Sequence, residues 1–401
     1  MHPTLASLLA ISVVALLAPL LSDTLCRRRV PAVVVEILLG IAIGPQLLGL
    51  ASVDATIETL SRFGLAFLFF MAGFEIDFAR IRGRPLWLAL AGWLISLLLA
   101  MAVARTMAAA GLSSAPLYIG LALTTTAIGT LMPILRDGHE LDTRFGTYIL
   151  AAGAVGEFVP ILAIALLLNP DQGEMVGAGQ LVLYAAILVV VALLAGRRQP
   201  GPVVRLLART LRSSDQWAVR LSIVLLIGLA SLAQAFSIEF LLGAFAAGVI
   251  AGRLFDVALQ VRPHHIDVVR AKYEGIAFGF LVPIFFVASG MQFDLAALWR
   301  DPLSLALLPL FVVLFLVVRG LPALLLYRGT LGAGERLPLA LMASTQLPLV
   351  IAITDLGVDR KLLEPSLATA MVGAGMLSVL LLPPLALQLR RQRPATEAAE
   401  A

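Results

Sequence analysis

One acidic side chain, Glu157, stands alone within an apolar run that extends from Phe145 to Leu168. An ionisable group near the centre of a bilayer costs about 2.5–3.5 kcal/mol on insertion scales, and such groups mark ion or proton pathways. A buried carboxylate can bind a proton or a cation, and binding of one displaces the other. Glu157 is therefore the first candidate for an ion-binding or proton-binding residue.

Arg319 is a second charge inside an apolar segment, about 12 Å from the inner end of that segment at the rise of an α-helix. A guanidinium remains protonated and needs an anionic partner. We expect Arg319 to be the charge partner of Glu157 in the core of the protein. A purely structural Glu157–Arg319 ion pair is the alternative, because buried pairs often serve architecture.

Two other apolar segments are interrupted by hydroxyl, amide and proline residues, at 123–130 (LTTTAIGT) and at 343–348 (ASTQLP). Interrupted membrane helices in matching positions indicate a transporter binding site, because unwound backbone exposes groups that bind ions. Hard cations prefer oxygen, so the candidate neutral ligands beside Glu157 are Thr125, Thr126, Ser344 and Gln346. The alternative is that these small polar residues only let helices pack closely.

The composition predicts an all-α polytopic membrane protein, since 60% of the residues are hydrophobic, 13% are charged and the mean hydropathy is +0.98. Segments of about 20 apolar residues give about 13 transmembrane helices. They are expected near 5–21, 30–50, 57–78, 86–107, 115–135, 144–168, 178–196, 217–236, 238–252, 274–292, 304–327, 337–355 and 363–388. Only Ser237 and Glu239 separate the eighth from the ninth, so one long bent helix is an alternative there.

The two interrupted segments lie seven spans apart, and this odd offset makes their chain directions opposite, as in inverted repeats. Basic residues support the span count because they gather in alternate loops. The basic loops contain, among others, Arg27–Arg29, Arg80–Arg84, Arg197–Arg220 and Arg390–Arg393. This distribution predicts an N-terminus outside and a C-terminus in the cytoplasm, in an inner (plasma) membrane.

Several classes of function lack their sequence signatures. No phosphate-binding loop or dinucleotide fingerprint occurs, Cys26 is the only cysteine, and no Cys/His spacing suggests a zinc site. We expect no enzyme activity, no cofactor, no nucleotide or nucleic-acid partner, and no metal beyond a cation carried at Glu157. A secondary transporter, a channel, or a structural or sensory membrane protein remains.

Three further acidic residues lie near the predicted inner ends of their spans. Glu36, Glu75 and Asp77 are candidates for a cytoplasmic funnel that leads to the site. Anchoring at the membrane interface or local ion pairing is the alternative reading.

Four segments carry a resemblance to a known family. Residues 30–45, 67–77, 242–248 and 283–291 resemble, in the expected order, helices of the monovalent cation:proton antiporter superfamily, in particular its Kef-type sodium/proton and potassium/proton exchangers. The similarity extends over about residues 5–388. Glu157 falls where that family has its ion-binding Asp, and Arg319 where it has a core Lys or Arg. The chain departs from the family at Gly156, where the family has Asn, Asp or Gln.

The resemblance implies a transmembrane antiporter domain over residues 1–390, with a short cytoplasmic tail at 391–401 and no C-terminal nucleotide-binding regulatory domain. It implies a core bundle at about 86–168 and 304–388, in which the two broken helices cross. A dimerisation scaffold at about 5–78 and 178–292 is implied as well, together with a homodimer and elevator-type alternating access.

The expected function is exchange of protons for a monovalent cation, Na⁺ or K⁺, across the lipid bilayer around Glu157. One alternative is a sodium-coupled symporter of an organic anion, which resembles the same architecture. Another is a non-transporting sensor or scaffold in which Glu157 and Arg319 form a structural pair.

Overall fold

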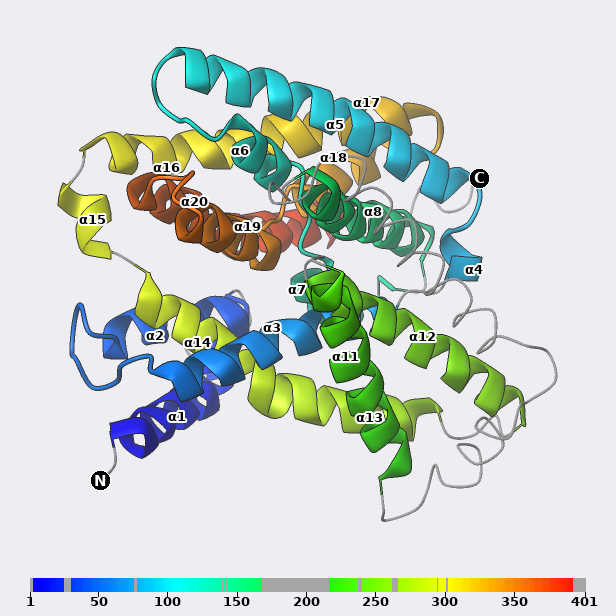
Figure 1. Cartoon of the computed structure of the whole chain (residues 1–401). Coiled ribbons are helices and arrows are strands. Elements are labelled where there is room, and N and C mark those ends of the chain that lie inside the picture. The colour runs from blue at the N-terminus through cyan, green and yellow to red at the C-terminus, as the bar shows by residue number, and fades with distance from the viewer. Residues whose placement is uncertain are drawn as a thin grey trace. The chain divides into compact units, whose positions relative to one another are not determined.

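The structure is a computed structural model, and it describes residues 3–24, 30–75, 78–138, 140–141, 143–167, 216–236, 240–261, 266–293, 295–300 and 302–391 (Figure 1). These residues form helices and connecting segments without any strand, which confirms the all-α prediction. The earlier elements are α1 (Pro3–Thr24), α2 (Ala32–Ile43), α3 (Ala55–Glu75), α4 (Phe78–Ile81), α5 (Arg84–Ala109), α6 (Pro116–Leu123), α7 (Ile128–Asp137), α8 (Arg144–Leu167), α11 (Trp217–Ala235) and α12 (Phe240–Val261). The later ones are α13 (Ile266–Ile276), η2 (Ala277–Leu281), α14 (Val282–Gln292), α15 (Leu295–Arg300), α16 (Pro302–Phe315), η3 (Leu316–Gly320), α17 (Leu321–Leu326), η4 (Tyr327–Gly329), α18 (Ala333–Ala343), α19 (Pro348–Asp359) and α20 (Pro365–Arg391).

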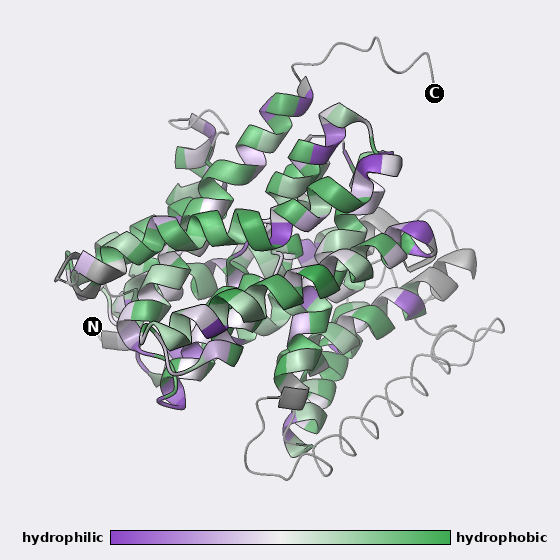
Figure 2. Cartoon of the chain, turned by 90° about the horizontal axis from the view of Figure 1, so that it is seen from above, coloured by the Kyte–Doolittle hydropathy of each residue, from purple (hydrophilic) through white to green (hydrophobic). Residues whose placement is uncertain are grey.

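Within the described residues, nine helices are long and apolar enough to cross a membrane, and three shorter apolar helices cover Ala32–Ile43, Pro116–Met132 and Phe240–Phe255. Each of them coincides with one of the predicted spans. The remaining predicted span, 178–196, lies outside the described residues, so the total of about 13 stays a prediction. Figure 2 shows hydrophobic residues along most of the described helices, as expected for elements surrounded by lipid and by one another.

The contacts divide the chain into two compact units. The first unit comprises residues 1–54, 77–160 and 286–401, and the second comprises residues 55–76 and 161–285. The predicted core bundle and dimerisation scaffold have different bounds, and they stay a prediction.

In the first unit, the two interrupted helices lie at the centre. Of the most apolar stretch in Ala333–Asp359, 89% is buried, against 28% for α5, which lies along α6 and α17 (Figure 1). Large apolar side chains of α5 such as Trp87 and Leu98 are more than two-thirds exposed, as suits a helix that faces hydrocarbon. The polar breaks are therefore shielded by the surrounding helices of their own unit.

The predicted boundary between the eighth and ninth spans is correct. Helix α11 ends at Ala235, α12 begins at Phe240, and the two helices pack side by side, so the alternative of one long bent helix is wrong. Gly243 makes this packing possible, because a Cβ atom there would lie 2.4 Å from the carbonyl oxygen of Leu229.

Helices α3 and α12 make the closest packing in the second unit, and glycines on both helices permit it. A Cβ atom on Gly73 would lie 2.2 Å from the carbonyl oxygen of Phe245, and one on Gly248 would lie 2.0 Å from that of Phe70. Small residues at a helix interface let two backbones approach in this way. Such contacts with backbone atoms cannot be relieved by rotating a side chain.

We expect Gly248→Ala to lower the thermal stability of the purified protein in detergent, because the added methyl group forces α3 and α12 apart at a cost of about 1–3 kcal/mol. Gly228→Ala is the matched control, since a Cβ atom at Gly228 of α11 meets nothing within 4 Å. Alanine should leave stability unchanged or raise it there. Equal melting temperatures for the two variants would contradict the packing argument.

Candidate functional site

Both interrupted helices lose their helical conformation at the predicted places. The first break, residues 124–127, separates α6 from α7, and the second, residues 344–347, separates α18 from α19. All of these residues are buried, with exposures of no more than 3%. The unwound backbone must therefore find its hydrogen-bond partners inside the protein.

The two breaks supply those partners to each other. The Ala127 N–H donates to the carbonyl oxygen of Thr345 at 2.8 Å, and the Thr126 hydroxyl donates to that of Ala343 at 2.7 Å. In the other direction, the Gln346 amide Nε2 donates to the carbonyl oxygen of Leu123 at 3.0 Å. Each break thus satisfies groups that the end of a helix in the other half leaves free.

A second helix in each half supports its break. The N–H of Thr126, the third residue after α6, donates to the carbonyl oxygen of Gly156 on α8 at 3.0 Å. The N–H of Gln346, the third residue after α18, donates to the Ser378 hydroxyl on α20 at 2.9 Å. The equivalent placement of these two bonds is what inverted repeats predict.

Ser378 is a site residue that the sequence analysis missed. It is fully buried, and its oxygen lies 2.9 Å from the Gln346 carbonyl oxygen and 2.7 Å from that of Gly375. The sequence contains a signal for this residue in the spacing of the two repeats. Ser378 follows Gln346 by 32 residues, and Gly156 follows Thr126 by 30 residues. An alignment of the two repeats would therefore have placed Ser378 close to the position equivalent to Gly156.

Arg319 lies on η3, a π-helical turn between α16 and α17, and its side chain is buried. Turns of this kind inside α-helices occur frequently at functional sites. The guanidinium donates from Nε and Nη2 to the Thr126 hydroxyl oxygen, at 3.0 and 2.7 Å, and from Nη2 to the carbonyl oxygen of Ala152 at 3.2 Å. Arg319 therefore holds the first break against α8 with neutral acceptors.

Gly156 leaves the space that this guanidinium occupies. A Cβ atom at Gly156 would lie 2.6 Å from Arg319 Nη2 and 2.6 Å from the Thr126 hydroxyl oxygen. A larger residue at position 156 would therefore collide with Arg319 and Thr126. In this chain the arginine fills the place that a side chain at position 156 would take.

Glu157 is 1% exposed on α8, and neither carboxylate oxygen has a hydrogen-bond partner in the structure. Gly153, one turn earlier, packs directly on Ile128, so α8 lies against the start of α7. The backbone amides of Ile128 and Gly129 face the carboxylate there, at the positive end of the α7 dipole. A buried acid without a partner is costly, and a proton or a cation would remove that cost.

The expected neutral ligands have different surroundings. The Thr125 oxygen lies 2.9 Å from the Ala122 carbonyl oxygen and 3.2 Å from Gln346 Oε1, so these two side chains meet across the breaks. The Thr126 oxygen carries the Arg319 bonds, and the Ser344 hydroxyl donates within its own helix to the Ala340 carbonyl oxygen at 2.7 Å. Thr125 and Gln346 thus bond to each other, Thr126 bonds to Arg319 and to the Ala343 carbonyl oxygen, and Ser344 bonds within its own helix.

The expected charge partner does not bind Glu157 directly. The donors of Arg319 go to Thr126 and Ala152, and no hydrogen bond joins the guanidinium to the Glu157 oxygens. Among the described residues, no group of three or more His, Cys, Asp and Glu side chains comes together to hold a metal ion. The site is therefore built around one carboxylate and one nearby fixed cation.

The residues expected to form a cytoplasmic funnel are not brought together in one unit. Glu36 is buried on α2 of the first unit, and Glu75 is the half-buried last residue of α3 in the second. Asp77 lies outside the described residues. The funnel stays a prediction.

Comparison with known proteins identifies relatives along almost the whole chain. The chain is 26% identical over 400 residues to the putative Na(+)/H(+) antiporter YjbQ of Bacillus subtilis (strain 168), covering 95% of this chain and 62% of that protein. It is 26% identical over 404 residues to cation/H(+) antiporter 17 of Arabidopsis thaliana, covering 95% of this chain and 48% of that one. It is also 26% identical over 286 residues to the Na(+)/H(+)-K(+) antiporter GerN of Bacillus cereus, covering 70% of each. The chain thus spans about half to two-thirds of the length of the longer relatives.

A solved structure shares the fold. The sodium proton antiporter MjNhaP1 from Methanocaldococcus jannaschii superposes with a TM-score of 0.68 over 97% of both chains, at 17% sequence identity. The transmembrane sodium/hydrogen exchanger family matches residues 12–388. This match, over nearly the whole chain, establishes that the chain belongs to the transmembrane sodium/hydrogen exchanger family.

Proposed function

We propose that the protein exchanges protons for a monovalent cation, Na⁺ or K⁺, and that both ions compete for Glu157. The observation that carries this proposal is the buried carboxylate with both oxygens unpartnered, beside the N-terminus of α7. The names of the relatives, which are sodium/proton and cation/proton antiporters, support the same class of reaction.

The competition follows from the number of acids. A proton neutralises Glu157 in a low-dielectric environment, whereas a bare cation needs the ionised carboxylate and additional oxygen atoms. Oxygens of Thr125 and Gln346 at the crossing of the breaks are the neutral ligands that we propose, because they already lie 3.2 Å apart. A single carboxylate cannot hold both ions, so loading one releases the other.

One-for-one competition at Glu157 sets the net charge that moves in a cycle, and the constant charge of Arg319 does not change it. With Glu157 ionised, the acid and the guanidinium sum to zero, and either a proton or a monovalent cation raises the sum by one. The two loaded forms of the site therefore carry equal charge. We propose that one proton is exchanged for one cation without net charge movement.

Exchange also requires that the loaded site reach both sides of the membrane. The bonds between the breaks make the site one connected body, which suits elevator-type movement of a core past a scaffold. A homodimer in an inner (plasma) membrane, with the N-terminus outside and the C-terminus in the cytoplasm, completes this proposal. The sequence similarity to antiporters and the distribution of basic residues support it.

The geometry weighs against the two alternative functions. A structural pair would have Arg319 bonded to Glu157, whereas its donors go to Thr126 and Ala152. A symporter of an organic anion would use the guanidinium for the anion, but three of its bonds already hold protein oxygens. Cation exchange at Glu157 requires no change in the hydrogen bonds that Arg319 makes to Thr126 and Ala152.

Glu157→Gln tests the central residue. The amide has the shape of the acid but cannot ionise, so we expect proton release evoked by Na⁺ or K⁺ pulses to fall to the level of empty proteoliposomes that contain a pH dye. Glu58→Gln is the matched control, because Glu58 is half exposed in a pair with Arg62 on α3 and should leave transport unchanged. A folded Glu157→Gln protein that still exchanges ions would refute the proposal.

The charge balance predicts that transport is independent of voltage. Moving one net charge would shift the steady-state ion gradient by the work of the membrane potential, about 2.3 kcal/mol per 100 mV. We expect no shift when sodium-driven proton gradients are measured at potentials set with valinomycin and potassium. A steady state that follows the potential would show that more than one proton moves per cation.

Gly156→Ala tests the position of the Arg319 guanidinium. The methyl group would collide with Arg319 Nη2 and the Thr126 hydroxyl, so we expect a loss of thermal stability of about 1–3 kcal/mol and weaker cation-dependent stabilisation. Gly92→Ala on α5 is the control, since a Cβ atom there meets nothing within 4 Å. A Gly156→Ala protein as stable as the parent would mean that Arg319 sits elsewhere.

A further inference from the structure

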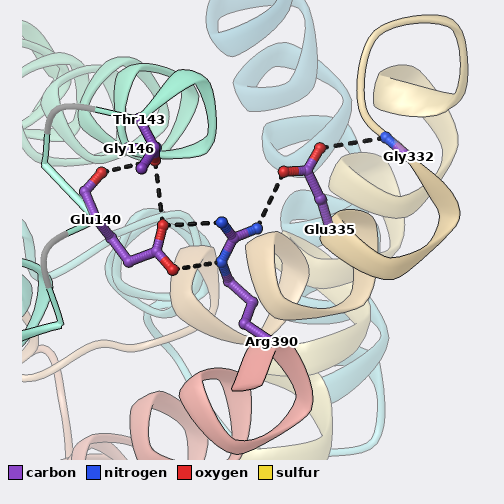
Figure 3. A network of polar contacts seen from close by, with 6 residues as sticks. All are labelled: Glu140, Thr143, Gly146, Gly332, Glu335 and Arg390. Carbon is purple, nitrogen blue, oxygen red and sulfur yellow. Dashed lines mark hydrogen bonds and ion pairs between the residues drawn. The ribbon is translucent and has the colours of Figure 1, made fainter. Parts of the chain in front are cut away.

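Arg390, in the last turn of α20, contacts two acids, which Figure 3 shows, and an aromatic ring. Its Nε and Nη2 donate to Oε1 and Oε2 of Glu140 at 2.6 and 2.8 Å, and its Nη1 donates to Oε1 of Glu335 at 3.0 Å. The guanidinium carbon lies 4.1 Å from the centre of the Phe145 ring. We call Arg390, Glu140, Glu335 and Phe145 the Arg390 cluster.

Each partner of Arg390 is fixed to the end of a different helix. The Glu140 N–H donates to the Leu135 carbonyl oxygen of α7 at 2.9 Å. Phe145 is the second residue of α8, whose first turn is capped by the bond from Gly146 N–H to the Thr143 hydroxyl at 2.9 Å. Glu335 lies in the first turn of α18, where its Oε2 accepts the Gly332 N–H at 3.3 Å (Figure 3).

The same four helices form the ion site, α7 and α18 with their other ends and α8 and α20 near their middles. Helix α7 begins at Ile128 beside Glu157, and α8 carries Glu157 itself. Helix α18 ends at Ala343, whose carbonyl oxygen accepts the Thr126 hydroxyl, and α20 holds Gln346 through Ser378. One side chain therefore joins one end of each of the four helices that contribute to the site.

The chemistry of the cluster suits a permanent connection. The contact with Glu140 is bidentate, and the side chains of Arg390 and Glu140 are 18% and 13% exposed, so water screens it less than a surface ion pair. Without the guanidinium, the two carboxylates would face each other without compensation. Lysine has the charge but not the planar fork, so it can replace only part of this geometry.

We infer that Arg390 is a positioning residue that holds α7, α8, α18 and α20 in one fixed arrangement throughout the transport cycle. This inference rests on the proposed function, because the arrangement matters through the ion site that these four helices form. The competing role is a gate, in which the cluster opens on one side of the membrane during each cycle. A fixed connection predicts one constant distance between these helix ends during the cycle. A gate predicts two different distances.

Pulsed electron paramagnetic resonance measures those distances without requiring transport. In a Cys26→Ser background, spin labels at Arg144→Cys and Ala333→Cys, both exposed, report the separation of α8 from α18. In lipid nanodiscs we expect one narrow distance distribution that is the same at acid and alkaline pH, with and without Na⁺ or K⁺, and a broader one after Arg390→Gln. A second distance that appears with cation or pH, or an Arg390→Gln distribution as narrow as the parent's, would overturn the inference.

Transport supplies the functional readout. We expect Arg390→Gln to raise KM for the cation about ten-fold, with a smaller effect on the maximum rate, and Arg390→Lys to recover part of this loss. Arg62→Gln, at an exposed arginine, is the control and should change neither value. A fall in the maximum rate of Arg390→Gln with an unchanged KM would contradict a positioning role.

A covalent substitute separates a fixed connection from a gate. With Glu140→Cys and Arg390→Cys in the Cys26→Ser background, a short bis-methanethiosulfonate linker should lower the raised KM toward the parent value. If the linker instead stops exchange and reduction restores it, the cluster must open and the inference is wrong. Failure of the proposed function is read separately, from ion exchange that persists in Glu157→Gln.

Discussion

The structure depends on one unusual arrangement: a buried carboxylate faces two backbone amides without accepting a hydrogen bond, while the polar groups of the breaks around it are bonded. Around Glu157, the two breaks exchange backbone bonds, Ser378 holds the second break, and Arg319 holds the first. Because these groups are already bonded to one another, they cannot easily reorient to stabilise the charge of Glu157. A small positive ion from outside would remove the cost of the bare carboxylate, which supports the proposed binding and release of ions at Glu157.

The crossing of the breaks also explains why irregular backbone is tolerated at membrane depth. Non-helical chain survives there only where other protein groups satisfy it. The acceptors at Thr345 and Ala343 come from the second half of the chain, and the donors at Ala127 and Thr126 come from the first. Neither half can complete its break alone, so folding of the site and association of the two halves are coupled.

Part of this site could be predicted from the sequence and part could not. The breaks were visible because proline and hydroxyl residues interrupt long apolar runs, and Glu157 was visible because it is a lone acid in one of them. The hydrogen-bond partner of Arg319 could not be predicted. Whether Arg319 bonds to Glu157 or to Thr126 depends on how closely the guanidinium approaches α8, and the glycine at position 156 allows that approach. The Arg390 cluster joins residues 250 positions apart that look like ordinary loop charges in the sequence.

The position of Arg319 reconciles two demands that conflict in the sequence. A guanidinium bonded to Glu157 would keep the acid ionised and oppose protonation, whereas no cation at all would leave the empty site with an uncompensated negative charge. In the structure, Arg319 donates its hydrogen bonds to Thr126 and Ala152. Its guanidinium lies against Gly156, the residue next to the acid. Its charge is therefore present near the site, but its donors do not occupy the carboxylate. This separation of charge from hydrogen bonding is what the proposed exchange of ions at Glu157 requires.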